Sequence, residues 1–176
     1  VNDFVMGWKI SGSYNGARIT GDGKAGALLA LKNVDKPFPL EAKLNVGKTV
    51  IRVNGTITKP QELAAIDMRL YLAGASMADL YPLTGITLPK TPEFSTEGHL
   101  IGVTDKRGGK WTYEKFKGKV GDSDIAGSLV YEAKQPRPLL SGTVVSNLLQ
   151  LSDLGPVIGA DSNESKKERG LSLIHI

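Results

Sequence analysis

The sequence predicts a mainly β fold, built from antiparallel strands with two short helices. Short runs alternate between apolar and polar residues, as in Ile125 to Tyr131. Turn-forming residues separate these runs, since the chain holds 21 Gly and 9 Pro. Strict alternation puts unlike side chains on the two faces of a sheet, which is typical of antiparallel sheets with one wetted face.

The N-terminal segment reads as a hairpin over Phe4 to Thr20 that turns at Tyr14 to Ala17. The composition of Gly21-Asp22-Gly23 predicts a second turn. The pattern of Ala25 to Lys32 fits a strand or a helical turn, and periodicity does not separate the two. Lys36 to Pro39 is a proline-containing breaker.

Two strands are predicted next, and Gly47 to Thr58 is the clearest strand of the first half. Leu40 to Asn45 and Gly47 to Thr58 alternate strictly, and Lys59-Pro60 ends the second of them. Gln61 to Ala65 fits one helical turn. Asp67 to Gly74 follows as another strand with an apolar side.

A short helix is predicted over Ser76 to Leu83, because the Ser76 hydroxyl can cap a free N–H of its first turn. Leu88 to Pro92 is expected to be an extended linker. Phe94 to Thr104 and Lys110 to Lys119 then predict a hairpin across a glycine-containing turn.

The stretch from Gly118 to Pro138 organises the second half of the chain. It begins with the polar corner Gly121 to Asp124, continues as the strand Ile125 to Tyr131, and ends at Pro136-Arg137-Pro138. Leu139 to Val145 is the next predicted strand, and a second short helix is expected over Leu149 to Leu154.

An internal repeat accompanies these elements. Asp79 to Gly85 matches Asp153 to Gly159 at an offset of 74 residues (153 − 79), with the shared pattern D-L-x-P-x-x-G. A strand, a proline breaker and a second strand precede each copy. We therefore predict two stacked units, neither of which buries its apolar face alone.

Composition narrows the function classes. The chain has 176 residues, a net charge of +4 and no cysteine, which excludes a disulfide scaffold and a thiolate metal site. The aromatic residues near the basic run match no RNA-recognition signature, so we expect no nucleic-acid partner. No run approaches the roughly 18 apolar residues that span a bilayer.

Catalytic and metal sites are not predicted. His99 is expected to be a surface or edge residue, with a hydrolase using it as the alternative. Asp122 and Asp124 flank Ser123, but this corner offers too few oxygens for calcium, so Asx-type turn bonding is expected. Gly21 to Lys24 lacks the spacing of a phosphate loop.

Both ends of the sequence point to a fragment. The chain starts at Val1 in mid-pattern without Met, so an upstream anchor would be invisible. Residues 161–176 are expected to form a disordered tail after a domain spanning 1–160. Its last residues, Leu171 to Ile176, resemble a translated sequencing adapter and are excluded from fold reasoning.

Several motifs resemble the AsmA family of bacterial envelope proteins. They include Lys36 to Leu40, Val53 to Ile57, Leu80 to Pro82 with Leu88 to Pro92, and Ser146 to Gly159. The most specific is the G-x-x-G-x-S-D-I-x-G run from Gly118 to Gly127. The resemblance covers roughly Trp8 to Ala160.

The resemblance implies a long, curved antiparallel sheet that forms a groove in the periplasm, with an inner-membrane anchor outside this fragment. It implies a non-enzymatic role in phospholipid transport between the membranes and in outer-membrane biogenesis, without a cofactor. The expected partners are phospholipid acyl chains, with outer-membrane proteins as the alternative. The groove candidates are Ile51, Val53, Ile57, Met68, Leu70, Leu72, Ile125, Leu129, Leu140 and Val144.

Overall fold

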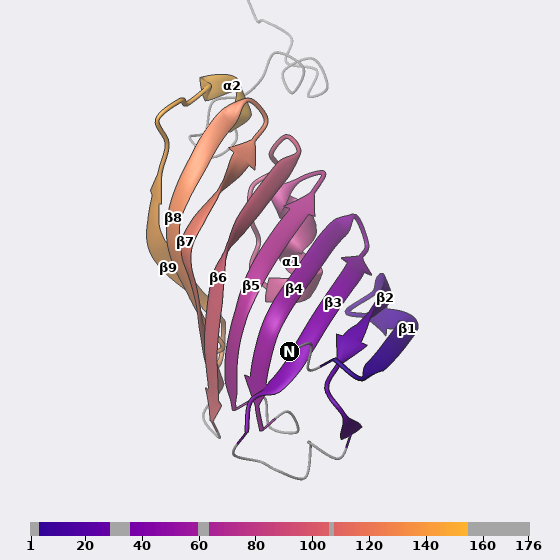
Figure 1. The fold of residues 1–176 in the computed structure, drawn as a ribbon. Helices are drawn as coiled ribbons and strands as arrows, with labels where there is room; N and C mark the ends of the chain where they lie inside the picture. The colour runs from indigo at the N-terminus through magenta and orange to yellow at the C-terminus, as the bar shows by residue number, and fades with distance from the viewer. Residues whose placement is uncertain (1–3, 29–35, 60–63, 106–107, 155–176) are drawn as a thin grey trace, which may run out of the picture.

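A computed structural model describes residues 4–28, 36–59, 64–105 and 108–154 of the protein. Nine antiparallel strands form one open sheet in which each strand pairs with its neighbours in the sequence (Figure 1). The strands are β1 (Met6–Tyr14), β2 (Ala17–Ala25), β3 (Phe38–Val46), β4 (Thr49–Thr58), β5 (Ala65–Gly74), β6 (Phe94–Asp105), β7 (Gly108–Val120), β8 (Ser123–Glu132) and β9 (Leu139–Val145). This confirms the predicted fold class, and for the described residues it excludes a closed β-sandwich, the other architecture that alternating strands can form.

Tight turns explain why successive strands pair. Asn15 and Gly16, between β1 and β2, have φ angles of 47° and 80°. Gly47 and Gly121 open the next two short turns with φ angles of 58° and 57°. Glycine adopts this left-handed region without steric cost, so these positions let the chain reverse within two residues.

The predicted turn at Gly21-Asp22-Gly23 is wrong, because all three residues lie inside β2. A Cβ on Gly21 or Gly23 would collide with the adjacent strand β3, and with Leu44 and Trp8 respectively. The two glycines therefore serve close packing across strands and do not reverse the chain.

Other boundaries differ more modestly. The strand after the first breaker begins at Phe38, two residues before the predicted start. The hairpin formed by β6 and β7 is tighter than predicted, since β7 begins at Gly108. The segments Ala25 to Lys32 and Gln61 to Ala65 lie partly outside the described residues, and so does the second copy of the repeat, Asp153 to Gly159. The tail 161–176 lies entirely outside them.

Both predicted helices are present and short. The first comprises the 3-10 turn η2 (Met77–Leu80) and α1 (Tyr81–Thr84), and the second is α2 (Leu151–Leu154). The predicted cap is confirmed, because Ser76 Oγ accepts a bond from the backbone N–H of Ala78 at 3.3 Å. Ser76 Oγ also accepts the N–H of Thr91 at 2.9 Å, so the linker after α1 is held against the helix start.

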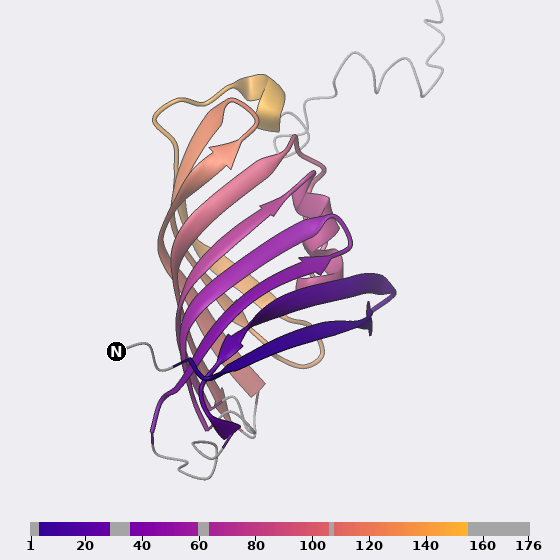
Figure 2. The ribbon, with the colours of Figure 1, turned by 45° about the vertical axis from the view of Figure 1, so that its right-hand side comes forward.

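The η2–α1 segment lies against one face of the curved sheet (Figure 2). Asn15 in the β1–β2 turn donates to the carbonyl of Pro82 at 2.9 Å, and Tyr131 in β8 donates to that of Thr84 at 2.8 Å. Leu80 packs with the main hydrophobic cluster, whose other buried members are Phe94, Phe116, Val120 and Ile125. The segment thus joins strands that are far apart in the sheet order.

The two halves of the sheet place their elements at matching positions. At the offset of 74 residues, β4 coincides with β8 and η2 coincides with α2 at both bounds. The pairing register is also the same in both units: Arg52 faces Tyr71, and the residues 74 positions later, Ala126 and Val145, face each other. Thr49 and Ser123, which begin the equivalent strands, are both fully buried. Two stacked units need the same pairing register between their strands, and these two halves share it.

Glycine at position 55 is predicted to be needed by the sheet. A Cβ there would lie 2.6 Å from the Met68 Cα, so Gly55→Ala should lower the free energy of unfolding by about 2 kcal/mol. Gly12→Ala on the same face is the control, because no atom lies near its Cβ. It should be neutral or stabilise by about 0.5 kcal/mol. Urea unfolding measures both, and equal effects would contradict the packing argument.

Candidate functional site

The strand registers divide the sheet into two unlike faces. Directly opposed residues share a face, and one face carries no charged side chain among the paired strand residues described. We call it the uncharged face. Its large side chains include Trp8, Ile10, Leu40, Leu44, Ile51, Val53, Ile57, Met68, Leu70, Leu72, Leu100, Trp111, Tyr113, Phe116, Ile125, Leu129, Tyr131, Leu140 and Val144.

All ten residues predicted to line a groove lie on the uncharged face. Ile51 faces Leu72 and Val53 faces Leu70 across β4 and β5. Ile57, Met68 and Ile125 are buried, and Val144 is 52% exposed. The other six are partly exposed, namely Ile51, Val53, Leu70, Leu72, Leu129 and Leu140. Alternation alone therefore identified the shared face correctly.

Glycines on this face sit beside its largest side chains. The Trp8 ring occupies the space of a Cβ on Gly23, and the Trp111 ring does so at Gly102 and Gly109. Gly98 leaves the same room for Phe116 and Tyr113. Sequence reasoning treated these glycines only as turn and strand residues. Their role depends on cross-strand neighbours, which the register alone reveals.

Two tyrosine hydroxyls on the uncharged face, those of Tyr113 and Tyr131, bond to other parts of the protein. The Tyr113 hydroxyl lies 3.2 Å from the Leu70 carbonyl oxygen and 3.1 Å from Thr96 Oγ1. Burial raises the pKa of Tyr113 to about 12, so its hydroxyl stays neutral at physiological pH. Tyr131 donates to Thr84. The hydroxyls thus add little polarity to this face.

The first helical segment covers the uncharged face unevenly. Ile125 belongs to the cluster around Leu80, and Leu129 and Leu72 pack against that cluster. Val53 and Leu70, in the neighbouring strands β4 and β5, lie outside it. The helical segment therefore packs on β6 to β8 through Leu80 and does not reach Val53 or Leu70.

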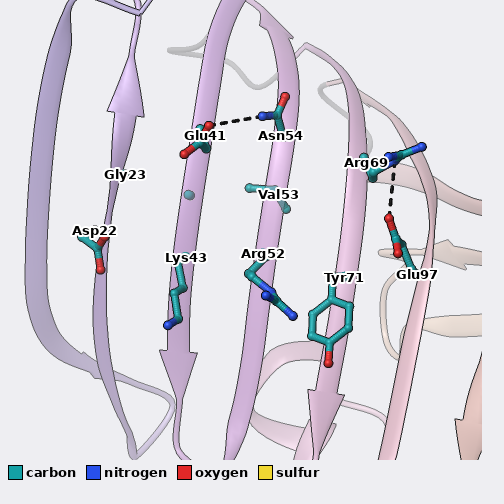
Figure 3. Close-up of a pocket in the computed structure, with 11 residues that line it drawn as sticks. Asp22, Gly23, Glu41, Lys43, Arg52, Val53, Asn54, Arg69, Tyr71 and Glu97 are labelled. Carbon is teal, nitrogen blue, oxygen red and sulfur yellow. Dashed lines mark hydrogen bonds and ion pairs between the residues drawn. The ribbon is translucent and has the colours of Figure 1, made fainter.

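The opposite face is polar and its charges are largely matched. Figure 3 shows the side chains that line a shallow depression over β2 to β6. Its volume is about 570 Å³, and Arg52 Cζ lies 3.9 Å from the centroid of the Tyr71 ring. Arg69 Nε lies 3.6 Å from Glu97 Oε1, and Asn54 donates to Glu41 at 3.3 Å. Three cations and three carboxylates line the depression. A surface with paired, exposed charges of this kind is favourably solvated by water.

His99 lies on this polar face between two carboxylates. Its Nε2 is 2.6 Å from Asp67 Oδ1 and its Nδ1 is 3.0 Å from Glu114 Oε1. The bond to Asp67 is the main cause that raises the pKa of His99 above 6.5, with Glu114 contributing and partial burial opposing. The predicted surface position is confirmed, and among the described residues no hydroxyl bonds to the ring.

The polar corner before β8 is a structural junction. Asp153 Oδ2 accepts from the N–H groups of Asp122 and Ser123 and from the Ser123 hydroxyl, at 2.9, 2.9 and 2.8 Å. Asp124 accepts from the backbone N–H groups of Asn147 and Leu148, whose bonds lower the pKa of its carboxyl. The expectation of Asx-type turn bonding is thus corrected: these bonds are long-range, since Asp153 and Asp124 hold separate segments together.

These features define a class of protein: an open antiparallel sheet with one uncharged face and one charged face. The model of the AsmA family matches residues 1–171. The chain is also 44% identical over 169 residues to the AsmA family protein YhjG of Escherichia coli (strain K12), which covers 96% of this chain. The chain therefore belongs to the AsmA family, as its motifs predicted.

The match has limits in length and in structure. The chain spans 25% of the length of that relative. No solved structure matches the chain. Within the described residues, no helix is long and apolar enough to cross a bilayer. Membership of the family is consistent with an envelope protein.

Loss of the Asp153 carboxylate is predicted to destabilise the protein. Asp153→Ala leaves the buried N–H of Ser123 without an acceptor and removes the shorter bond of its hydroxyl, so the free energy of unfolding should fall by about 3 kcal/mol. Asp122→Ala is the matched control, because that side chain is exposed and should change stability by less than about 0.5 kcal/mol. Chemical denaturation compares them. A stable Asp153→Ala variant would show that the junction contributes little.

The His99 charge is predicted to depend chiefly on Asp67. Its raised pKa means that protonated His99 stabilises the fold below pH 6.5, and that this contribution is lost as pH rises through the folded pKa. Asp67→Asn should lower the pKa of His99 more than Glu114→Gln does. NMR titration of the imidazole measures this. A wild-type pKa at or below 6.5 would refute the proposed bonding.

Proposed function

We propose that the uncharged face binds the acyl chains of phospholipid. Through it, the protein supports phospholipid transport between the inner and outer membranes and outer-membrane biogenesis. The observation that carries the proposal is the absence of charge from the paired residues of all nine described strands on this face. An acyl chain there would meet mainly carbon atoms, and the hydroxyls of Tyr113 and Tyr131 on this face are bonded internally.

The energetics favour such a ligand. Burying one CH₂ group contributes roughly 0.8 kcal/mol, so a contact over several methylenes outweighs the ordering of a chain. The partly exposed side chains of Val53 and Leu70 offer such contact across β4 and β5. Gly23, Gly102 and Gly109 let the Trp8 and Trp111 rings lie close to the backbone of the sheet.

The proposed setting is the periplasm, with anchoring to the inner membrane in the full-length protein. Family membership supports an envelope location. We further propose that the two 74-residue units stack along one axis, which the matching registers support. Stacking would extend the uncharged face along the length of a longer sheet.

A scaffold for outer-membrane proteins is the second candidate. Within the described chain β1 and β9 each pair with one strand, so each presents an edge. Val144 and Val145 on β9 are 52% and 55% exposed. An extended polypeptide could add to such an edge by main-chain hydrogen bonds.

We propose that the chain has no enzymatic activity. The rival is a hydrolase that uses His99 with a nearby Ser or Asp. His99 has Asp67 and Glu114 as its bonded neighbours, and these would orient an imidazole but supply no hydroxyl nucleophile. A screen with ester and glycoside substrates decides this, since turnover lost in His99→Ala would establish the hydrolase.

Photo-crosslinking is predicted to label the two faces differently. A photoreactive residue at Leu70 should capture phospholipid, while one at Arg69, its neighbour on the opposite face, should not. The same probe at Leu129 should capture less lipid than at Leu70, because the helical segment covers that region. Mass spectrometry of the adducts measures the yields.

Two further comparisons sharpen the result. Arg52 is a second polar-face control, and Leu70→Lys should reduce lipid capture at Val53 by placing a charge beside it. Equal lipid labelling from both faces, or none from either, would reject the acyl-chain proposal. Adducts that contain polypeptide but never lipid would instead support the scaffold.

A further inference from the structure

A second depression lies on the polar face, over a bulge in β7. It measures about 650 Å³, and its lining residues are Arg69, Glu97, Gly98, His99, Lys115, Lys117 and Gly118. It adjoins the depression of Figure 3, with which it shares Arg69 and Glu97. This second depression lies on the side of the sheet opposite the uncharged face, so it is separate from the surface proposed to bind acyl chains.

The bulge inserts one extra residue into β7. The register between β6 and β7 shifts by one residue between Glu97 and His99. The register between β7 and β8 shifts by one residue between Tyr113 and Phe116. Lys115, at the shift, has a φ of 51°, a left-handed conformation that is unfavourable for a residue with a side chain. Its N–H donates to Ser128 Oγ at 3.1 Å. The bulge brings Lys115 and Lys117 into the lining of one hollow.

The charges in this hollow are unbalanced. Arg69, Lys115 and Lys117 are cationic, and Glu97 is the one carboxylate in the lining. Glu97 pairs with Arg69, whereas neither Lys115 nor Lys117 forms an ion pair within the part of the chain that is described. His99 bonds to Asp67 and Glu114, two carboxylates against its single positive charge, so the two lysines supply the excess of positive charge in the lining. The neighbouring depression, by contrast, has equal numbers of cations and carboxylates.

We propose that this hollow binds a phosphate-bearing anion. Two ammonium groups and a guanidinium can surround phosphate oxygens with charge-assisted hydrogen bonds. The strained bulge would be retained because it aims Lys115 at the ligand, as bulges beside binding sites do. The shared chemistry is the phosphate group, whether it comes from a lipid head group or from a soluble compound.

Calorimetric titration with inorganic pyrophosphate tests the site. Wild-type protein should bind with a Kd of about 1 mM or below. Lys115→Gln and Lys117→Gln should each weaken binding about fivefold or more, and Glu97→Gln should strengthen it. Lys110→Gln and Lys119→Gln are matched controls, because both lysines lie on the same strand and face outside the hollow, and they should change the Kd by less than about twofold.

Two results would overturn the proposal. One is the absence of pyrophosphate binding to wild-type protein at about 10 mM. The other is equal weakening by all four lysine variants, which would indicate diffuse charge attraction. Lys117 lies in a regular part of the strand, so its variant tests the site even if Lys115→Gln disturbs the bulge, which circular dichroism would reveal.

Vesicle sedimentation separates the two sources of phosphate. Binding to phosphatidylglycerol vesicles that is lost in the Lys115→Gln/Lys117→Gln double variant supports a lipid head group. Pyrophosphate binding without vesicle binding supports a soluble phosphate compound. Either result supports the site, and neither depends on acyl-chain binding by the uncharged face.

Discussion

The whole sheet depends on keeping the charged and uncharged faces in register across nine strands. Side chains alternate with a period of two, so a slip of one residue would move every charge of a strand to the other face. Short turns with left-handed glycines at Gly47 and Gly121 set the register between neighbouring strands. The cost of burying even one lysine on the uncharged face penalises alternative pairings.

The bulge in β7 shows how this constraint acts within one strand. Trp111 and Tyr113 point to the uncharged face at odd positions, whereas Phe116, Gly118 and Val120 do so at even positions. One extra residue near Lys115 changes the phase and keeps Lys115, Lys117 and Lys119 on the polar face. The same local irregularity thus preserves the apolar face and collects cations on the other.

The helical segment packs on one face of the sheet and connects strands that lie far apart in it. Asn15 and Tyr131 are distant in the strand order, yet both bond to the segment from Met77 to Thr84. Leu80 is buried among side chains of β6 to β8, and Leu72 and Leu129 pack against this cluster, whereas Val53 and Leu70 lie outside it. A single short element therefore covers part of the uncharged face and leaves Val53 and Leu70 outside its contacts.

Alternation and turn chemistry were enough to predict the antiparallel fold, the Ser76 cap and the shared face of all ten groove candidates, because these depend on neighbours along the chain. The sequence by itself also determined the family through its motifs. It misjudged Gly21-Asp22-Gly23, since glycine serves turns and close packing alike, and only Trp8 and Leu44 on adjacent strands distinguish the two. The carboxylate pair around His99, the Asp153 junction and the lysine hollow were decided by tertiary structure alone. Each joins residues separated by 15 or more positions, and pairing over such distances follows from strand order and register, which local patterns do not encode.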